Sequence, residues 1–569
     1  MLKPIRFFIL LCLPLGLLAE GVSWNVGLIS QVGRGEQLGL NYDYLENFVA
    51  GSIEYGNWYL DLSFESSTPP EYGFEFQGFD RIFLSYIGNN RSLELGDISA
   101  VFGRGLALNL DEDQAIDFDN EILGLRLTSS FLDIHELDII AGVNDGYRFY
   151  SPSSELRLPD GEAEYKLVGA EATINSSSGF WTLAPYLISS QMISDYSWRE
   201  LDPTLGIITN DTVSQKMHSI QTGLSQSLYG ELWDFYLEYN QTHKTFDYPL
   251  VTQSINQTDD GVTLETNSRD YTSTGQALNI QVNWFPEWFT AMLEYKRYLN
   301  GPEVSADKRN PLLLASKPLP WQLGPTGIRQ HDISLMGNVT HPVDYGDELG
   351  WNLELRRDIG YSWVVILNAA QTSQASDSRD PDQAAGFLPK QDITRNPWQE
   401  YFAEIEYSGG AISQRMLIAY TSSVLSGASA AEITKHITLV PAYLSWYASN
   451  DIVLSTVVEL QQSTVSGEAY DGELIDGHDF QSMHGILSMD LKQKYSASLI
   501  WDSSDDPNLN SGAHGTQNWI SGELSLKPLD GLWVRASYGK EKGGVRCTGG
   551  VCRVLNPFEG FRMTLEWRL

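Results

Sequence analysis

Apolar and polar residues alternate strictly along the C-terminal stretch of the chain, residues 561–569. In FRMTLEWRL every odd-numbered residue is apolar and every even-numbered one is polar or charged. The same two-residue period recurs in WISGELSLK (519–527) and in LWVRASY (532–538). A period of two places alternate side chains on opposite faces of a β-strand. The pattern therefore predicts strands with one apolar and one polar face.

Short connections and long polar segments separate these strands. The short connections lie at residues 229–231, 285–287, 408–411, 448–451, 492–495 and 528–531. The long polar segments lie at 193–214, 243–270, 300–327, 374–398, 465–477, 503–516 and 541–557. In outer-membrane barrels, short turns lie at one end and long loops at the other. At roughly 22 residues per strand and connection, the length predicts an all-β transmembrane antiparallel barrel of about 24 strands, with a range of about 20 to 26.

Tryptophans follow the short turns closely. They are Trp58, Trp181, Trp233, Trp288, Trp363 and Trp533, which predicts an aromatic girdle at a membrane interface. The alternative for each is a tryptophan chosen only as a good strand residue. A soluble β-sandwich or β-solenoid adhesin is the other fold, but it needs polar outer faces. Here Leu524, Leu526, Val534, Leu565 and Trp567 all fall on apolar faces.

The N-terminus has the layout of a secretory signal peptide. Lys3 and Arg6 precede an apolar run over residues 7–18, and Ala19 supplies a small residue for cleavage. We therefore predict a signal peptide at 1–19, a barrel at 20–569 and location in a bacterial outer membrane. Strand-like alternation begins by Val26, so we expect no separate plug domain.

Composition limits the partners of the chain. The net charge of −36 disfavours nucleic acid, and 12% aromatic and 42% hydrophobic residues argue against disorder. The expected partners are outer-membrane lipid and lipopolysaccharide, with a partner lipoprotein as a further possibility, and no cofactor is expected. Cys547 and Cys552 remain after signal removal, and in an exported protein their spacing favours a disulfide. A metal site is the alternative, although no histidine lies nearby.

Candidate chemistry concentrates in residues 96–121, GDISAVFGRGLALNLDEDQAIDFDNE. The third glycine of a dinucleotide fingerprint is missing, and the acidic residues do not follow the EF-hand pattern, although an irregular calcium site remains open. We interpret Arg104 as projecting into the lumen, where one of the neighbouring acids pairs with it. The predicted constriction, which filters cations, consists of Arg104, Asp111, Asp113, Asp117, Asp119 and Glu121. The alternative is a glycine-marked bend followed by a solvated acidic loop.

Residues 96–127 resemble a motif, G-D-x-x-x-x-F-G-R-G-L-x-L followed by acidic residues, of an uncharacterised family of exported barrel-like proteins from Bacteroidetes and related bacteria. CTGGVCR (547–553) is similar to a late loop of that family. The resemblance implies an outer-membrane barrel and supplies no substrate.

Three classes of function remain after these observations. An enzyme is disfavoured because the nine histidines are scattered, and only His478 beside Asp479 is a candidate for catalysis. The leading hypothesis is a passive or partner-gated pore with an acidic lumen, since about 20 strands or more enclose too wide a space for side chains alone to fill. The alternative is a non-conducting barrel that binds a partner lipoprotein or an extracellular ligand. Segment 300–327 separates the two, because packing inside the lumen would weaken the pore hypothesis.

Overall fold

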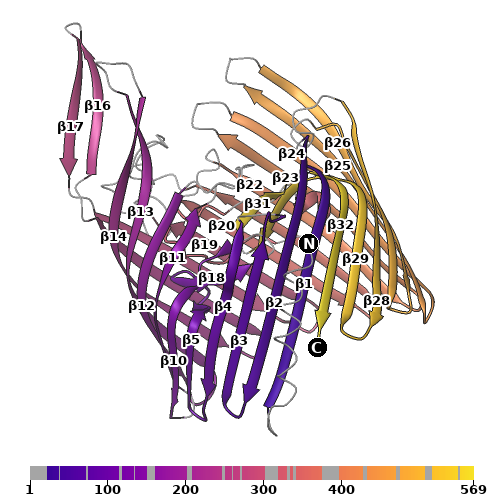
Figure 1. Ribbon diagram of the computed structural model, residues 1–569, viewed down its shortest axis with the longest axis horizontal. Helices are drawn as coiled ribbons and strands as arrows, with labels where there is room; N and C mark the ends of the chain where they lie inside the picture. The colour runs from indigo at the N-terminus through magenta and orange to yellow at the C-terminus, as the bar shows by residue number, and fades with distance from the viewer. Residues whose placement is uncertain are drawn as a thin grey trace.

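In the computed structural model, the strands close into a single antiparallel barrel (Figure 1). The structure describes residues 22–569 except 38, 72–74, 114–117, 133–134, 150–160, 202–207, 247–249, 259–260, 270–271, 301–317, 330–332, 338–340, 342, 375–395, 427–431, 469–473, 507–514, 549–550 and 556. The signal peptide prediction therefore lies outside the described residues.

The barrel sheet has 24 strands, the number that the length predicted. They are β1 (Val22–Gln37), β2 (Leu40–Tyr55), β3 (Trp58–Ser67), β4 (Phe76–Ile87), β5 (Arg91–Ile98), β10 (Ile122–Phe131), β11 (His135–Phe149), β12 (Gly161–Asn175), β13 (Trp181–Leu201), β14 (Ile208–Tyr229), β15 (Trp233–Phe246), β18 (Thr272–Trp284), β19 (Thr290–Leu299), β20 (Glu348–Ile359), β21 (Trp363–Ser373), β22 (Trp398–Gly409), β23 (Ile412–Ser426), β24 (Glu432–Ser449), β25 (Ile452–Glu468), β26 (Leu474–Leu491), β27 (Tyr495–Ser504), β28 (Gln517–Leu529), β29 (Leu532–Glu541) and β32 (Phe558–Arg568).

The remaining elements lie in the long connections. Loop 99–121 contains β6 (Ala100–Phe102), β7 (Leu108–Leu110), β8 (Glu112–Asp113) and β9 (Phe118–Asp119). The others are β16 (Leu250–Thr258), β17 (Gly261–Arg269), the one-turn helix α3 (Ser334–Gly337), β30 (Gly544–Thr548) and β31 (Val551–Leu555). Within the described part of the chain, no helix is long and apolar enough to cross a membrane.

The outer surface of the barrel is apolar, as the alternation predicted. Leu524, Leu526 and Trp567 are among the exposed large hydrophobic residues, whereas Ser521 of β28 is buried. The six tryptophans after the short turns are between 37% and 63% exposed. An apolar outer band with aromatic rings near one end is the surface of a barrel that meets lipid.

Part of the chain folds into the lumen of the barrel, which corrects the prediction about a plug. Two loops from the long-loop end pack, in their described residues, against inward-facing side chains: residues 99–121 between β5 and β10, and residues 318–347 between β19 and β20. Their side chains Phe102, Leu108 and Trp321 have no exposed surface. We call these two loops together the lumen plug. The expectation of no separate plug domain is wrong, because two loops that fold inward form a buried core inside the barrel, and such a core leaves no trace in the strand alternation.

Barrel closure depends on the antiparallel pairing of β1 with β32. Gly35 and Gly560 are partners in that pairing, and a Cβ added to Gly35 would lie 2.2 Å from the backbone oxygen of Glu559. A Cβ on Gly51 of β2 would meet nothing nearer than 3.8 Å. The seam therefore tolerates no side chain at residue 35.

We predict that Gly35→Ala lowers the stability of the barrel, because the seam strands must separate to admit the methyl group. Overpacking of this kind costs about 1–3 kcal/mol. Urea unfolding, together with the mobility of unheated protein in a denaturing gel, measures the loss. Gly51→Ala is the matched control and should behave like the wild type. Equal stability of the two variants would contradict the prediction.

Candidate functional site

Asn120 joins the two loops of the lumen plug. Its side-chain Nδ2 donates hydrogen bonds to the carbonyl oxygens of Asn109, at 2.8 Å, and Pro320, at 3.1 Å. Its Oδ1 accepts the backbone N–H of Asp111 at 2.7 Å, and its own carbonyl accepts the hydroxyl of Tyr165 at 2.5 Å. Asn120 is fully buried. One amide thus ties both loops to each other and to the wall strand β12.

Trp321 anchors the second loop beneath the first. Its ring lies against that of Tyr165, with centroids 4.6 Å apart, and its Nε1 donates to Oε1 of Gln221 on β14 at 2.9 Å. The Nε2 of Gln221 donates in turn to the carbonyl of Ala107 at 3.0 Å. A backbone bond from the N–H of Asn109 to the carbonyl of Trp321 completes the contact. Buried polar groups here are paired across loop and wall, which fixes the register of the plug.

The Gly-Arg-Gly turn binds two carboxylates of the wall. The N–H of Gly103 donates to Oε2 of Glu171 on β12 at 3.0 Å, and the N–H of Arg104 donates to Oε2 of Glu238 on β15 at 2.6 Å. Gly103 and Gly105 have φ angles of 58° and 89°, a region in which a side chain is disfavoured. A Cβ on Gly103 would also lie 2.5 Å from the Glu238 carboxyl group. Both glycines are needed for this close approach.

Among the described residues, the Arg104 guanidinium has its partners on the lumen wall and pairs with none of the acids that follow it. It stacks on the ring of Tyr236, 3.9 Å from its centroid, and donates a hydrogen bond to Gln281. The predicted pairing of Arg104 with one of the acids is therefore wrong for those that the structure describes. The Gly-Arg-Gly turn faces wall strands that are distant from it in the sequence. No local sequence pattern could therefore indicate Tyr236 and Gln281 as the partners of Arg104.

The acidic residues of the first plug loop lie on a different part of the wall. Glu121 and Glu112 approach Nη1 of Arg81 on β4, at 3.4 Å and 3.9 Å. Asp111, Asp113 and Asp119 lie on the same loop with partly or fully accessible side chains, whereas Asp117 lies outside the described residues. No group of three or more potential metal ligands occurs among the residues that are described.

The carboxyl groups of Asp119 and Asp344 have raised pKa values. Loss of hydration among the surrounding protein groups raises the pKa of Asp119 to about 7, with a contribution from the Glu121 carboxylate, although the N–H of Glu121 opposes the rise. Burial also raises the pKa of Asp344 to about 6, and the Glu348 carboxylate adds to the effect. Both side chains still touch water, so we interpret the cause as crowding by the surrounding protein. Part of the lumen charge therefore titrates near neutral pH.

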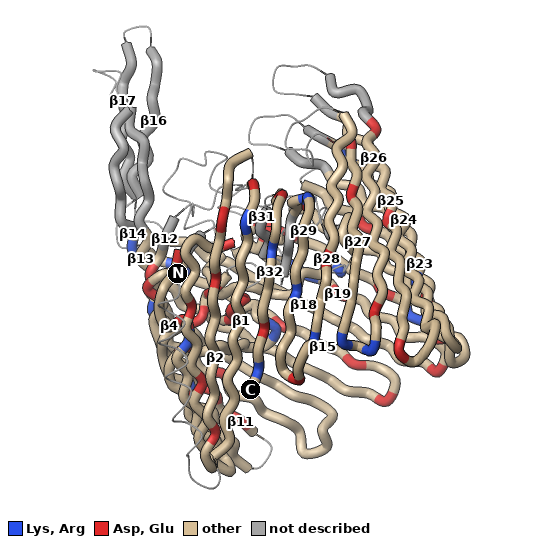
Figure 2. Tube along the Cα trace, turned by 45° about the vertical axis from the view of Figure 1, so that its right-hand side comes forward, with Lys and Arg blue, Asp and Glu red and all other residues tan. Residues whose placement is uncertain are grey.

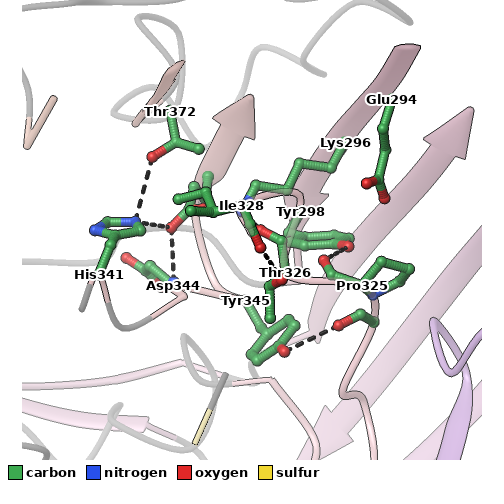
Figure 3. Close-up of polar contacts among 12 residues, drawn as sticks. Glu294, Lys296, Tyr298, Pro325, Thr326, Ile328, His341, Asp344, Tyr345 and Thr372 are labelled. Atoms are coloured by element: carbon green, nitrogen blue, oxygen red, sulfur yellow. Dashed lines mark hydrogen bonds and ion pairs between the residues drawn. The ribbon is translucent and has the colours of Figure 1, made fainter. Parts of the chain in front are cut away.

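The second plug loop is held by a buried ionic cluster (Figure 3). Lys296 of β19, which has no exposed surface, pairs with Glu348 and donates to the carbonyl of Thr326. The other oxygen of Glu348 lies 2.9 Å from Nε2 of His341 and accepts the N–H of Asp344 at 2.8 Å. A buried lysine retains its charge only when it is paired in this way.

Further along, the same loop reaches the opposite wall. Arg329 contacts Glu354 at 3.2 Å and Glu404 at 3.7 Å. Both oxygens of Glu459 on β25 accept backbone N–H groups at the start of α3, at 3.2 Å and 2.8 Å. The plug is therefore fixed at several points around the barrel, and sequence reasoning missed most of them. The only sequence indication was a long, proline-rich connection that fitted no regular strand.

The remaining sequence predictions concern cysteine and histidine. Cys547 and Cys552 are direct partners in the β30–β31 hairpin, a pairing whose Cα separation suits a disulfide. Their side chains are outside the described part, so the disulfide stays a prediction. The His478 side chain is likewise not described, and Asp479 accepts a hydrogen bond from Thr464 at 2.6 Å.

Comparison with known proteins gives one family and a set of distant structures. A model described as "Family of unknown function (DUF6029)" matches residues 38–408, which include both plug loops. No curated protein matches the sequence.

Three of the similar solved structures are a mutant of the ferric enterobactin receptor PfeA from Pseudomonas aeruginosa, the siderophore receptor PirA from Acinetobacter baumannii and the iron transporter FrpB from Neisseria meningitidis. Their identities are 9%, 6% and 11%, and their TM-scores are 0.48, 0.47 and 0.46. The matches cover 96% of this chain in each case, and 80%, 80% and 81% of the other chain. Structural similarity at these TM-scores and identities says nothing of what the lumen of this chain binds.

We predict that Asn120→Ala loosens the lumen plug without opening the barrel, because buried backbone groups of both loops lose their partner. Each unpaired group costs about 1–3 kcal/mol, so amide exchange in residues 99–113 and 318–329 should accelerate by about tenfold or more. Hydrogen exchange read by mass spectrometry measures this. Asn175→Ala, next to a short turn, is the control. Unchanged exchange in both plug loops would refute the role of Asn120.

We predict that the stability contributed by Asp119 is fully present below about pH 4, the ordinary range of an aspartate, and is lost as pH rises to about 7, because its pKa in the folded protein is raised. Asp119→Asn mimics the protonated group, so the variant should match the wild type at pH 3, gain some thermal stability over it at pH 5.5, where the carboxyl group is ionised only in the unfolded chain, and gain most at pH 8.5. Thermal unfolding at the three pH values tests this. Asp43→Asn, at an exposed position outside the plug, should show no such difference. A pH-independent effect of Asp119→Asn would contradict the assignment.

Proposed function

The chain belongs to the family of unknown function whose model its residues 38–408 match, and from this starting point we propose that it passes small solutes, cations in preference to anions, across the outer membrane. The lumen plug narrows the passage and gates it. Export by a signal peptide at 1–19 and contact with outer-membrane lipid and lipopolysaccharide are parts of the proposal. The observation that carries it is the excess of carboxylates on the lumen wall; the two inward-folded loops, each bound to that wall, argue against a permanently open pore and are the reason that we propose a gated one.

The charge of the lumen supports the preference for cations. Among the described residues, the buried acidic side chains outnumber the buried basic ones, and charged residues of both kinds lie along the strands as well as at their ends (Figure 2). Buried or partly buried acids include Asp138, Glu171, Glu238, Glu294, Glu348, Glu400, Glu404, Glu459 and, in the plug, Glu112, Asp113 and Glu121. The described basic residues near them include Arg81, Arg104, Arg126, Lys244, Lys296, Arg297, Arg329, Arg415 and Lys435. An excess of carboxylates along a pore attracts cations and repels anions.

A non-conducting barrel that serves as a scaffold for a partner lipoprotein or an extracellular ligand is the second candidate. The observation that favours it is the position of residues 318–327, which pack inside the lumen with Trp321 fully buried. A plug fixed this firmly would suit a barrel that never opens. Conductance separates the two functions.

We predict cation-selective channels in planar bilayers containing the refolded full chain, with larger conductance in Asn120→Ala, because the lumen plug is then loosened. Replacing Asp111, Asp113 and Asp119 together by asparagine should lower the cation-to-anion permeability ratio severalfold, since fixed negative charge is removed. The reversal potential in a salt gradient measures the ratio. A lipid-facing variant, Leu524→Ala, is the control for insertion. If both the wild type and Asn120→Ala insert and carry no current, the pore is refuted and the scaffold is favoured.

A further inference from the structure

Three buried polar atoms of the lumen wall have no hydrogen-bond partner among the residues that the structure describes. They are Nε2 of Gln461 and Oγ of Ser463 on β25, and Nε2 of His484 on β26. The three residues are 4%, 1% and 6% exposed. His484 stands opposite Glu459 in the strand register, so its side chain shares a face of the sheet with Gln461 and Ser463. Polar groups this deeply buried are rarely left unpaired, and we expect a ligand or ordered water at them.

Lys542, the residue that directly follows β29, lies beside this patch. Its ammonium interacts electrostatically with His484 and with the carboxylates of Glu459, Asp502 and Asp506. Within the described part of the chain, no carboxylate forms an ion pair with it. Loss of hydration lowers the pKa of Lys542, although the three carboxylates oppose the fall. The ammonium is therefore a partly dehydrated cation without a contacting counter-ion.

The carboxylates around Lys542 already have partners of their own. Glu459 accepts two backbone N–H groups at the start of α3, at 3.2 Å and 2.8 Å. Oδ1 of Asp502 lies 2.9 Å from Nδ1 of His484, and Oδ2 of Asp506 lies 3.6 Å from Nζ of Lys435. The groups that still lack a contacting partner are the ammonium and the three buried atoms.

These remaining groups can all donate hydrogen bonds to one ligand. The Gln461 amide nitrogen only donates, and the Ser463 hydroxyl donates as readily as it accepts. Asp502 stabilises the positively charged imidazolium form of His484, in which Nε2 also carries a proton and donates. We call Gln461, Ser463, His484 and Lys542 the donor cluster.

A carboxylate is the group that matches the donor cluster. It only accepts hydrogen bonds, and its two oxygens offer about four lone-pair sites. Bonds from cationic donors to a carboxylate are roughly twice as strong as neutral ones. A neutral ligand would leave the Lys542 ammonium without a counter-charge, and an apolar one would leave every donor unsatisfied.

The acidic surroundings select further among carboxylate-bearing solutes. Glu459, Asp502 and Asp506 lie close to the donor cluster, and they repel a solute that carries negative charge alone. A solute that also carries an ammonium group is attracted to these acids while its carboxylate reaches the donors. Amino acids and short peptides combine the two groups at a short separation.

We propose that the donor cluster binds the carboxylate of an amino acid or short peptide whose ammonium group faces the surrounding acids. The proposal deepens the proposed function by naming a class of solute, and it rests on that function only in that the solute must enter the lumen. Truncating Gln461 and Ser463 removes unpaired atoms and creates none, so these variants are expected to fold.

The test is calorimetric titration of trialanine into the refolded full chain in detergent micelles at pH 7. The wild type should bind, and Lys542→Gln should bind about tenfold or more weakly because the cationic donor is lost. Gln461→Ala combined with Ser463→Ala should show a similar loss, whereas Lys542→Arg should retain binding. Lys540→Gln is the matched control, because Lys540 pairs with Glu559 at 3.4 Å, and it should bind like the wild type.

Blocked peptides test the class of ligand in the same experiment. Trialanine amide, which has no carboxylate, should bind about tenfold or more weakly than trialanine. N-acetyl-trialanine, which has no ammonium group, should bind severalfold more weakly because the surrounding acids repel it. Equal affinity for the amide would overturn the carboxylate site, and equal affinity for the acetylated peptide would overturn the zwitterionic class.

Two further outcomes would refute the site. One is the absence of trialanine binding by the wild type, which would mean that the buried donors bind water only. The other is wild-type affinity in Lys542→Gln. Binding in micelles without current in bilayers would refute the pore and leave the site standing, and current without trialanine binding would do the reverse.

Discussion

Closure of the sheet through the β1–β32 pairing is the constraint on which the rest of the structure depends. A strand edge exposed to lipid would leave backbone N–H and C=O groups without partners, so a β-protein spans a membrane only as a closed ring. A ring of 24 strands encloses more space than the wall side chains can fill. Its interior must therefore contain water, a plug or both. In this chain, the lumen plug occupies part of that space.

The lumen plug is held by hydrogen bonds between its two loops and the barrel wall. Gly103 and Gly105 let backbone N–H groups approach two wall carboxylates, and the Arg104 guanidinium stacks on the ring of Tyr236 in the wall. Asn120 then binds the second loop to the first. Because both loops are tethered at each end to barrel strands, neither can leave the lumen as a domain would. Opening must come from local loosening of these contacts.

The wall could be predicted from the sequence because its determinants are local. Alternation in residues 519–569, the short turns and the tryptophans after them each report on the next few residues, and they indicated the strands and their lipid-facing side; the strand number followed from the chain length. The motif at residues 103–105 was also visible, but its partners were not. Glu171 and Glu238 come from strands that are remote in sequence, and only closure of the barrel brings them to the turn. The proline-rich segment before Trp321 indicated an irregular path without indicating where it leads.

The distribution of contacts decides which side of the plug can move. The side that faces β12, β14 and β15 combines apolar packing, paired amides and two carboxylate-bound N–H groups around Asn120 and Trp321. On the opposite side, α3 is bound by the carboxylate of Glu459 and by an apolar cluster that includes Ile333 and Leu335, and it also lies against β30. Separating α3 from the wall breaks two backbone hydrogen bonds to one carboxylate and the packing of this cluster, whereas loosening the Asn120 side leaves buried groups of both loops and of the wall without partners. The side around Asn120 and Trp321 is therefore the more firmly held one.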